Sequence, residues 1–327
     1  MFHCICHINL SLISLGIKSN PLSCIKPKTL TCFSCFSDFR AKTFFISHLY
    51  LFIIEVLKSS NGDISKIRGN VSSFTNRGGT VGLLETKDSF VVIDAQFPDF
   101  IQPLIDSISQ VKGKPIEFLC NTHHHGDHTA GNFAFKDLTQ KIVAQKNVPE
   151  LQKNAAELAK NVDKQVYANI LFEDQYLIKS GGERVTAYHF GAGHTFGDAM
   201  YHFEKDNVVH MGDLMFINMI PVYRVKDGSN FRSWISVLEK AISTFDKDTL
   251  FIFGHAPDKN LTKGNLENLT EMRNFLEASA DYIKKSLAEG KTTEQLTENL
   301  VIPKFEHRKA MNKDFTKTFV EGIASQL

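Results

Sequence analysis

The sequence predicts an α/β fold in layers, with two β-sheets inside and helices on the outside. Short runs rich in β-branched and apolar residues alternate with segments in which apolar residues recur at helical spacing. This order of strands and helices occurs twice along the chain. Strand meanders interleaved with helices bury their apolar faces when two sheets stack and helices cover them.

The first half begins with a predicted antiparallel meander. Gly78-Gly79 and Lys87-Asp88 separate its strands, as is typical of turns. A helix follows, with apolar residues at helical spacing. The predicted strands are Val71–Thr75, Thr80–Thr86, Ser89–Asp94 and Ile116–Cys120, and the predicted helix is Pro98–Val111.

The second half repeats the pattern and ends in a helical tail, Thr292–Leu327, which Pro303 interrupts. Its predicted strands are Ile142–Ala144, Gln175–Ile178, Arg184–His189, Ala199–Phe203, Asn207–Met211 and Thr249–Phe253. Its predicted helices are Pro149–Val162, Phe231–Thr244 and Leu266–Leu287. We therefore expect a leader at residues 1–60, a catalytic domain at 61–290 and a C-terminal helical extension at 291–327.

Residues 1–60 differ from the rest of the chain. Apolar runs at Ile8–Ile17 and Phe44–Leu57 flank a stretch with Pro21, Pro27 and several Ser and Cys residues. Three interpretations remain open: a degenerate export signal or anchor, a disordered leader, or upstream sequence absent from the mature protein. The second run is short for a bilayer, so no membrane span is expected. The location stays open between cytoplasmic and exported (periplasmic or secreted), the latter if this run acts as a signal.

The composition is typical of a globular protein with a substantial core, since 43% of the 327 residues are hydrophobic and 22% are charged. Lys and Arg (37) nearly cancel Asp and Glu (36), so charge gives no reason to expect nucleic acid as a partner. Most cysteines lie in the first 40 residues, which excludes a disulfide scaffold in the main body. Cys32 and Cys35 have metal-ligand spacing, and a small zinc or iron-sulfur site there is the alternative to an unstructured leader.

Four potential metal ligands lie within six residues, directly after the last strand of the first half. His123 and His125 are two residues apart, so both imidazoles point to the same side of an extended chain and one metal can take both. Gly126 permits a sharp turn, after which Asp127 and His128 can face a second metal. Imidazole nitrogens with a carboxylate suit zinc, and also iron or manganese.

A solvated histidine loop would not require further ligands elsewhere in the chain. Such residues are present, each shortly after a predicted strand: His194, Asp213 and His255. The sequence therefore predicts one metal site assembled from separate segments of the chain.

The order of these motifs, H-x-H-x-D-H followed by G-H-T, G-D and G-H, resembles that of the metallo-β-lactamase superfamily. The resemblance runs from about Val71 to Ala256. It implies a four-layer αββα sandwich, followed here by the C-terminal helical extension. It also implies two metal ions, zinc above iron or manganese, with these ligands: His123, His125 and His194 for the first, Asp127, His128 and His255 for the second, and Asp213 bridging both.

The same resemblance assigns roles to other polar residues. Asp94 matches an aspartate that steadies the metal-binding loop, and His124 fills a variable position and is not expected to be a ligand. His189 and His210 lie on predicted strands, where packing or hydrogen bonding is the expected role of a histidine.

The expected activity is hydrolysis of a small molecule. Two divalent ions lower the pKa of a bridging water, and the resulting metal-bridging hydroxide attacks an ester, thioester, lactone or amide carbonyl. Asp127 is the expected catalytic residue, because it can orient this nucleophile or accept its proton.

The segment His210–Phe216 and the helical tail resemble uncharacterised hydrolases of the superfamily more than the β-lactamases or glyoxalase II, whose basic cluster for glutathione is not evident after Leu261. Two departures from the β-lactamases lower the expectation of antibiotic hydrolysis. Asp213 stands where those enzymes generally carry Cys or Ser, and Phe216 stands where one group of them carries a substrate-binding Lys. β-Lactamase activity remains an alternative.

Other functions are weaker alternatives. The presence of both His128 and His255 favours two metals over a mononuclear-iron persulfide dioxygenase. A structural metal site would normally be closed by four ligands, often cysteines. The near-zero net charge disfavours a nuclease. The substrate is not identified, and the walls of its pocket are expected from Asn76–Thr80, Lys160–Phe172 and Phe216–Val225.

Overall fold

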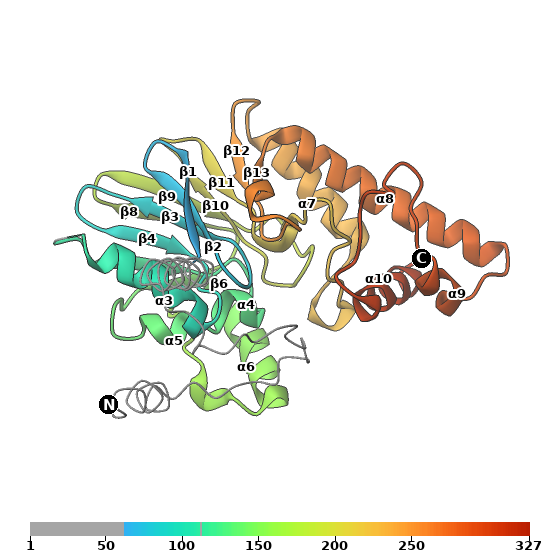
Figure 1. Ribbon diagram of the computed structural model, residues 1–327, viewed down its shortest axis with the longest axis horizontal. Coiled ribbons are helices and arrows are strands. Elements are labelled where there is room, and N and C mark those ends of the chain that lie inside the picture. The colour runs from blue at the N-terminus through green and yellow to red at the C-terminus, as the bar shows by residue number, and fades with distance from the viewer. Residues whose placement is uncertain (1–61, 112) are drawn as a thin grey trace, which may run out of the picture. The chain divides into compact units, whose positions relative to one another are not determined.

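The computed structural model describes residues 62–111 and 113–327, which form two stacked β-sheets with helices on their outer faces (Figure 1). The predicted leader, including the Cys32 and Cys35 pair, lies outside the described residues. The predicted αββα sandwich is confirmed.

The first sheet contains seven strands in chain order, β1 to β7. Strands β1 to β4 form an antiparallel meander, and β4 to β7 pair in parallel. The strands are β1 (Asp63–Arg68), β2 (Val71–Thr75), β3 (Val81–Glu85), β4 (Phe90–Ile93), β5 (Ile116–Cys120), β6 (Ile142–Gln145) and β7 (Ile170–Phe172). Between the parallel strands the chain crosses over through α3 (Pro98–Ser109), α4 (Gly126–Thr129), α5 (Asn132–Phe135) and α6 (Val148–Ala159).

The second sheet contains six strands, β8 to β13, in which only the β11–β12 pair is parallel among the described residues. Helix α7 (Phe231–Thr244) makes the crossover between those two strands. The strands are β8 (Gln175–Ser180), β9 (Glu183–Tyr188), β10 (Met200–Phe203), β11 (Val208–His210), β12 (Leu250–Ile252) and β13 (Lys263–Gly264).

Three apolar layers hold the sandwich together. Between the sheets, Val91 and Ile93 of β4 share one core cluster with Tyr201 and Ile252 of the second sheet. Outside the first sheet, the buried face of α3 packs in a second cluster. Outside the second sheet, α7 and the long helix α8 (Leu266–Ala288) cover a third. Helices thus pack on the outer face of each sheet, and the inner faces of the two sheets pack against each other.

Three short strands, β1, β7 and β13, were not predicted. The sequence of β1, Asp-Ile-Ser-Lys-Ile-Arg, has no alternation of buried residues, because it is an edge strand whose first four residues are exposed. Helix α6 ends at Ala159 rather than Val162, because Lys160 takes a left-handed conformation with φ 54°. The described part of the chain holds no helix long and apolar enough to cross a membrane.

The C-terminal helices share the apolar core of the second sheet. Helices α9 (Thr293–Glu298) and α10 (Lys313–Ala324) flank the segment with Pro303, where the sequence predicted an interruption. The ring of Phe275 in α8 stacks on Phe319 of α10 with centroids 5.7 Å apart, and meets the edge of Phe305 at 5.6 Å. The core cluster that contains these rings also contains Trp234 of α7.

Replacing Phe275 by Ala should therefore destabilise the whole described body rather than the C-terminal helices alone. Truncation of a buried Phe costs about 3–5 kcal/mol. We expect one unfolding transition, shifted by that amount, in urea titrations followed by circular dichroism. Leu158→Ala is the control, because Leu158 is 77% exposed and its loss should change the unfolding free energy by less than about 0.5 kcal/mol. A separate early transition for the C-terminal helices would contradict this expectation.

Candidate metal centre

The loops that follow the strands at one end of the sandwich carry all seven ligand candidates. The segment from His123 to His128 follows β5 of the first sheet. His194 lies between β9 and β10, Asp213 follows β11 and His255 follows β12, all in the second sheet. The two sheets therefore bring together residues that are widely separated in the sequence, as expected for chain segments that leave neighbouring strands at the same edge.

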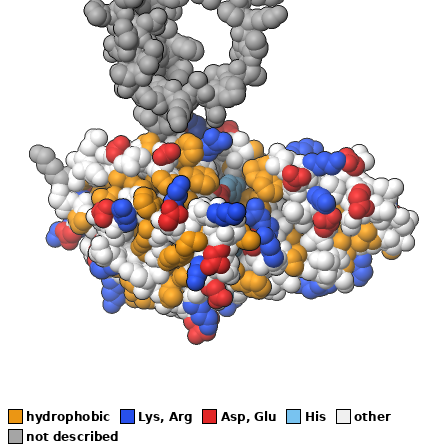
Figure 2. All heavy atoms as spheres, turned by 90° about the horizontal axis from the view of Figure 1, so that it is seen from below, with side chains coloured by type: hydrophobic (Ala, Val, Ile, Leu, Met, Phe, Trp, Pro, Cys, Tyr) orange, Lys and Arg blue, Asp and Glu red, His pale blue; other side chains and the backbone are white. Residues whose placement is uncertain are grey.

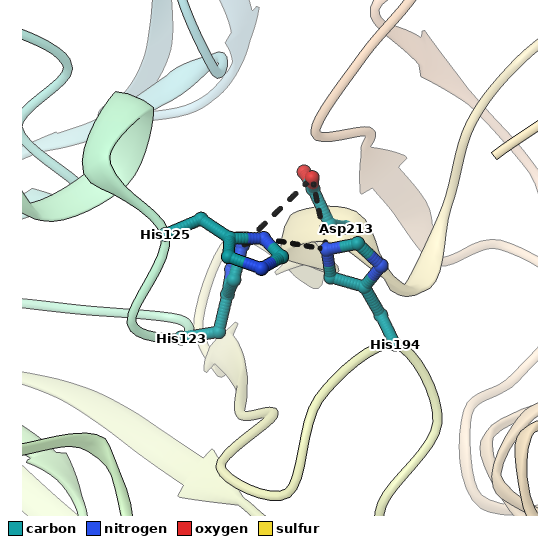
Figure 3. Close-up of side chains that lie close together, drawn as sticks. All are labelled: His123, His125, His194 and Asp213. Carbon is teal, nitrogen blue, oxygen red and sulfur yellow. Dashed lines mark hydrogen bonds and ion pairs between the residues drawn. The ribbon is translucent and has the colours of Figure 1, made fainter. Parts of the chain in front are cut away.

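One group of side chains contains three histidines and Asp213, with ligand atoms that all lie within 4.8 Å of one another (Figure 3). His125 Nδ1 lies 3.1 Å from His123 Nε2 and 2.9 Å from His194 Nε2. These three nitrogens face one another, as the ligand atoms of a single ion between the three rings would. Tetrahedral ligands at metal–nitrogen distances of about 2.0–2.1 Å lie about 3.3–3.4 Å apart, so a small outward movement of these rings would accommodate an ion.

A second group contains Asp127, His128 and His255, whose ligand atoms also lie within 4.8 Å of one another. Asp127 Oδ2 is 3.1 Å from His255 Nε2 and 3.7 Å from His128 Nε2. Histidine nitrogens and a carboxylate oxygen again form the donor set, which suits zinc, iron or manganese.

The carboxylate of Asp213 faces both groups. Its Oδ2 lies 3.5 Å from His194 Nε2 in the first group and 3.3 Å from His255 Nε2 in the second. Its Oδ1 lies 3.1 Å from His128 Nε2. The close approach requires Gly254, because a Cβ at that position would lie 2.1 Å from Asp213 Oδ1.

The buried polar atoms of this cluster are under-satisfied without a cation. Among the described residues, neither His128 Nε2 nor Asp213 Oδ1 has a hydrogen-bond partner of acceptable geometry, although both are buried. Buried polar atoms normally have such partners, so this pair of atoms fits the donor set of a bound cation. The arrangement of donor atoms thus fits a metal at each group.

Asp94 holds the loop that carries the first histidines. Its carboxylate accepts hydrogen bonds from the backbone N and the hydroxyl of Thr122, each at 2.8 Å, and lies 2.8 Å from His128 Nδ1. The Nδ1 contact fixes the ring so that Nε2 points to the metal position. This is the steadying role that the resemblance implied for Asp94.

Two further aspartates hold ligand loops, and the sequence did not single them out. Asp198 accepts from the backbone N–H groups of Gly193, His194 and Thr195 at 2.7–3.0 Å and thereby shapes the His194 loop. Asp227 Oδ2 lies 3.2 Å from His125 Nε2, the nitrogen that faces away from the first group. Asp198 has a local signal, because it follows His194 by four residues. Asp227 has none, since 102 residues separate it from His125.

Three further histidines of the described residues lie outside the two groups of ligand candidates. His210 Nε2 lies 2.9 Å from the carbonyl of Thr80, and His189 Nδ1 lies 2.7 Å from the carbonyl of Asp198. Hydrogen bonding was the expected role of both. His124 is buried beside His125, and burial lowers its pKa to about 3.

The two groups differ in their protonation without metal. Burial lowers the pKa of His123 and His194 well below the usual value, so both rings are neutral. Burial also lowers the pKa of His128 and His255, but nearby carboxylates, Asp213 foremost, outweigh it and raise both, to about 10 for His255. Burial tends to raise the pKa of Asp213, yet these two rings hold it well below its usual range.

The cluster opens to solvent on the side of the second group. The side chains of Asp127 and His255 are 29% and 16% exposed, whereas those of His128 and Asp213 are almost fully buried. Figure 2 shows a histidine side chain within a hollow of the surface, with hydrophobic side chains on both sides and Lys and Arg side chains below. Tyr223, which was expected in the pocket wall, is fully buried and bonds Gln326 instead.

The model of the metallo-beta-lactamase superfamily matches residues 74–255 of this sequence. The match covers more than half of the chain, and the chain belongs to this superfamily. Together with the His and Asp groups described above, it defines an MBL-fold metallo-hydrolase with a metal-binding cluster.

Two enzymes illustrate the sequence similarity. Metallo-beta-lactamase IND-1 of Chryseobacterium indologenes is 25% identical over 192 residues, which is 58% of this chain and 76% of that enzyme. A hydroxyacylglutathione hydrolase of Rhizobium meliloti (strain 1021) is 25% identical over 154 residues, 47% of this chain and 53% of that enzyme.

Among solved structures, the stereoselective inverting sec-alkylsulfatase Pisa1 of Pseudomonas sp. superposes with a TM-score of 0.64 and 12% identity. The likeness covers 81% of this chain and 50% of the sulfatase. This chain therefore spans about half the length of both the sulfatase and the hydroxyacylglutathione hydrolase. At 12% identity the structural likeness shows the shared fold alone.

The protonation of the second group predicts how metal uptake depends on pH. His128 and His255 carry protons at neutral pH in the metal-free protein, because their pKa values are raised, and an ion must displace both protons. We expect release of about two protons when this group fills at about pH 7.5, and tighter binding as pH rises. Calorimetric titration of metal-free protein with zinc, in buffers of different ionisation enthalpy, measures this number. Filling of the group without proton release would contradict the assignment of charges.

Proposed function

We propose that the protein is a dinuclear zinc hydrolase that cleaves an ester, thioester, lactone or amide bond in a small molecule. The position of Asp213 carries the proposal, because one buried carboxylate faces the three histidines of the first group and both histidines of the second. In this proposal Asp213 is shared by two ions. The remaining ligands are His123, His125 and His194 for the first ion, and Asp127, His128 and His255 for the second.

Divalent ions held at such a centre supply Lewis acidity and lower the pKa of water. The chain's own residues supply position and proton transfer. Asp127 is the most exposed member of the cluster, so its carboxylate can reach a water that approaches from solvent. Burial tends to raise its pKa, but His128 and His255 hold it far below its usual range, so Asp127 is ionised and can accept a hydrogen bond that orients that water.

Aromatic side chains beside the centre favour a substrate with an apolar part. Phe97 is 37% exposed and lies close to Gly78, which itself approaches the backbone of Asp127. Phe196 is 47% exposed, and its N–H donates to the carbonyl of Asp227 at 2.9 Å. Exposed aromatic rings at the rim of a polar site are typical of pockets for small acyl compounds.

Asp213 and Phe216 favour an acyl hydrolase over a β-lactamase, because β-lactamases of the superfamily generally carry other residues at these positions. The similarity to IND-1 keeps β-lactam hydrolysis as the second candidate. The similarity to a hydroxyacylglutathione hydrolase supports an acyl thioester as the first compound to test.

Loss of a proposed ligand should remove metal and activity together. We expect His125→Ala and Asp213→Ala to lower the zinc content from two ions per chain to at most one, and kcat/KM by at least about 100-fold. Even partners that only orient a ligand contribute about 10–100-fold. His202→Ala is the matched control, because His202 lies on β10 against Phe245 and outside the cluster. Full activity in a metal-free preparation, or one iron per chain, would overturn the proposal.

A substrate panel separates the two candidates. With zinc-loaded full-length protein, we expect S-lactoylglutathione or an acyl-homoserine lactone to be hydrolysed with a kcat/KM at least about tenfold above that of nitrocefin, a difference of about 1.4 kcal/mol in transition-state binding. A phosphodiester serves as the control substrate without an acyl group. Nitrocefin as the best substrate would establish the β-lactamase alternative, and cleavage of the phosphodiester alone would exclude an acyl hydrolase.

A further inference from the structure

We propose that Arg308, in the C-terminal segment between α9 and α10, is a positioning residue for the second metal, because it holds Phe216 against the ring of His255. This inference rests on the proposed dinuclear centre. It extends that centre to a part of the chain that lies beyond residue 255, where the match to the superfamily model ends.

Arg308 is a buried clamp between the C-terminal segment and the loop that follows Asp213. Its guanidinium donates to the carbonyls of Phe216 at 2.9 Å and Met219 at 2.6 Å. It also forms a two-pronged pair with Glu271 of α8, through Nε at 3.0 Å and through Nη2. The planar fork of Arg can satisfy the carboxylate and both carbonyls at once, which Lys cannot do.

The backbone beside Arg308 is paired with the same loop. Ile220 N donates to the carbonyl of Lys309 at 3.1 Å, next to a bridge between Met219 and Lys309. The C-terminal segment therefore fixes the loop from Phe216 to Ile220 by main-chain bonds as well as by the guanidinium. With these anchors, Phe216 has little freedom to shift.

Phe216 in turn holds His255. The two rings stack with centroids 5.2 Å apart and an angle of 19° between their planes. The backbone N of Ile217 donates to the carbonyl of His255 at 3.0 Å, so the main chain is paired at the same point. The ring and the backbone of His255 are thus both placed by the segment that Arg308 clamps.

His255 depends on this support more than the other ligands do. Two histidines of the first loop use the ring nitrogen that points away from the cluster to contact an aspartate. His125 Nε2 contacts Asp227, and His128 Nδ1 contacts Asp94. For His255, both neighbouring carboxylates face Nε2, and no residue in the described ranges hydrogen-bonds Nδ1. His194 also lacks such a bond, but its loop is tied by Asp198. Its ring contacts both Trp234 and Phe216, each at 5.6 Å and tilted by 58°, so it does not depend on the Phe216 ring alone.

Loss of the clamp should therefore loosen His255 and weaken the second metal more than the first. Partners that orient a ligand contribute about 10–100-fold to metal affinity. The test is a titration of metal-free full-length protein with Co²⁺, followed by absorbance and by calorimetry. We expect two steps in the wild type, and Arg308→Gln should raise the dissociation constant of the His255 step by about 10–100-fold while the other step changes less than about threefold.

Two further variants keep the test decisive. Phe216→Leu removes the flat ring and leaves the contacts of the Arg308 side chain in place, so it should weaken the same step even if Arg308→Gln folds poorly. Its effect on the other step should be smaller, because the Phe216 ring is stacked on His255 but only tilted against His194. His255→Ala identifies which titration step belongs to His255, because that step should be lost in this variant. Adding Arg308→Gln to His255→Ala should then leave the dissociation constant of the remaining step unchanged. Arg273→Gln is the matched control, since Arg273 pairs with Glu239 and Glu277 on the exposed side of the helices.

The outcomes separate this inference from the dinuclear proposal. Selective weakening of the His255 step in both Arg308→Gln and Phe216→Leu supports the inference. Two steps with wild-type dissociation constants in Phe216→Leu would overturn the inference and leave the dinuclear centre intact. Equal weakening of both steps in every variant, including the control Arg273→Gln, would do the same. Binding of only one Co²⁺ per chain in the wild type would overturn the dinuclear proposal itself, and with it any second ion for Arg308 to position.

Discussion

The carboxylate of Asp213 sets the electrostatic requirement for the whole centre. It is 4% exposed, and a carboxylate removed from water to this extent is costly unless positive charge compensates it. In the absence of metal, protonated His128 and His255 provide that charge, since the pKa values of both are raised. Metal ions at the two groups would replace these protons. In the folded chain without metal, the protonated histidines neutralise the buried carboxylate, and two divalent cations could supply the same positive charge. This compensation explains why so many ionisable groups are stable side by side.

The same requirement explains why the loops need so many outer partners. Five imidazole rings can converge only if each turns one chosen nitrogen inward, and hydrogen bonds to the opposite nitrogen select that orientation. Asp94 does this for His128 and Asp227 does it for His125. Asp198 acts on the backbone instead, where three N–H groups of the His194 loop converge on one carboxylate oxygen. The carboxylates outside the cluster therefore determine its geometry as much as the ligands do.

The sequence predicted the fold well, and the seven residues that it proposed as ligands lie close together in the structure, because both leave local signals. The apolar periodicity of α7 gave its bounds, Phe231–Thr244, without error. The seven residues of the cluster stand next to strand ends, which short motifs mark. Edge strands such as β1 leave no such signal, since their residues are mostly exposed.

The sequence did not predict contacts between distant segments of the chain. Asp227 and Arg308 are ordinary charged residues of loop segments, and no spacing relates them to His125 or Phe216. Their partners are 102 and 92 residues away, so only the folded chain brings them together. Tyr223 was misplaced for the same reason: its ring stacks on Trp234, and Gly322 of α10 approaches it closely.

The two sheets support their ligands in different ways. In the first sheet, His123 and His128 are held by Thr122 and Asp94, which belong to that sheet's own strand ends. In the second sheet, Asp198 ties the His194 loop, and further support comes from the chain after β13. Gln326 donates to the carbonyl of Ser229 at 2.7 Å, and the hydroxyl of Ser229 donates to the carbonyl of His194, also at 2.7 Å.

Arg308 reaches the other ligand loop of the second sheet by way of Phe216. The chain beyond residue 255 thus supports both loops indirectly, that of His194 through Gln326 and Ser229, and that of His255 through Arg308 and Phe216. Because a metal ligand is only as well placed as the loop that carries it, the unit that holds the centre includes the chain beyond residue 255, as far as Gln326. The helices after β13 are therefore part of the support of the metal centre and not an appendage to the sandwich.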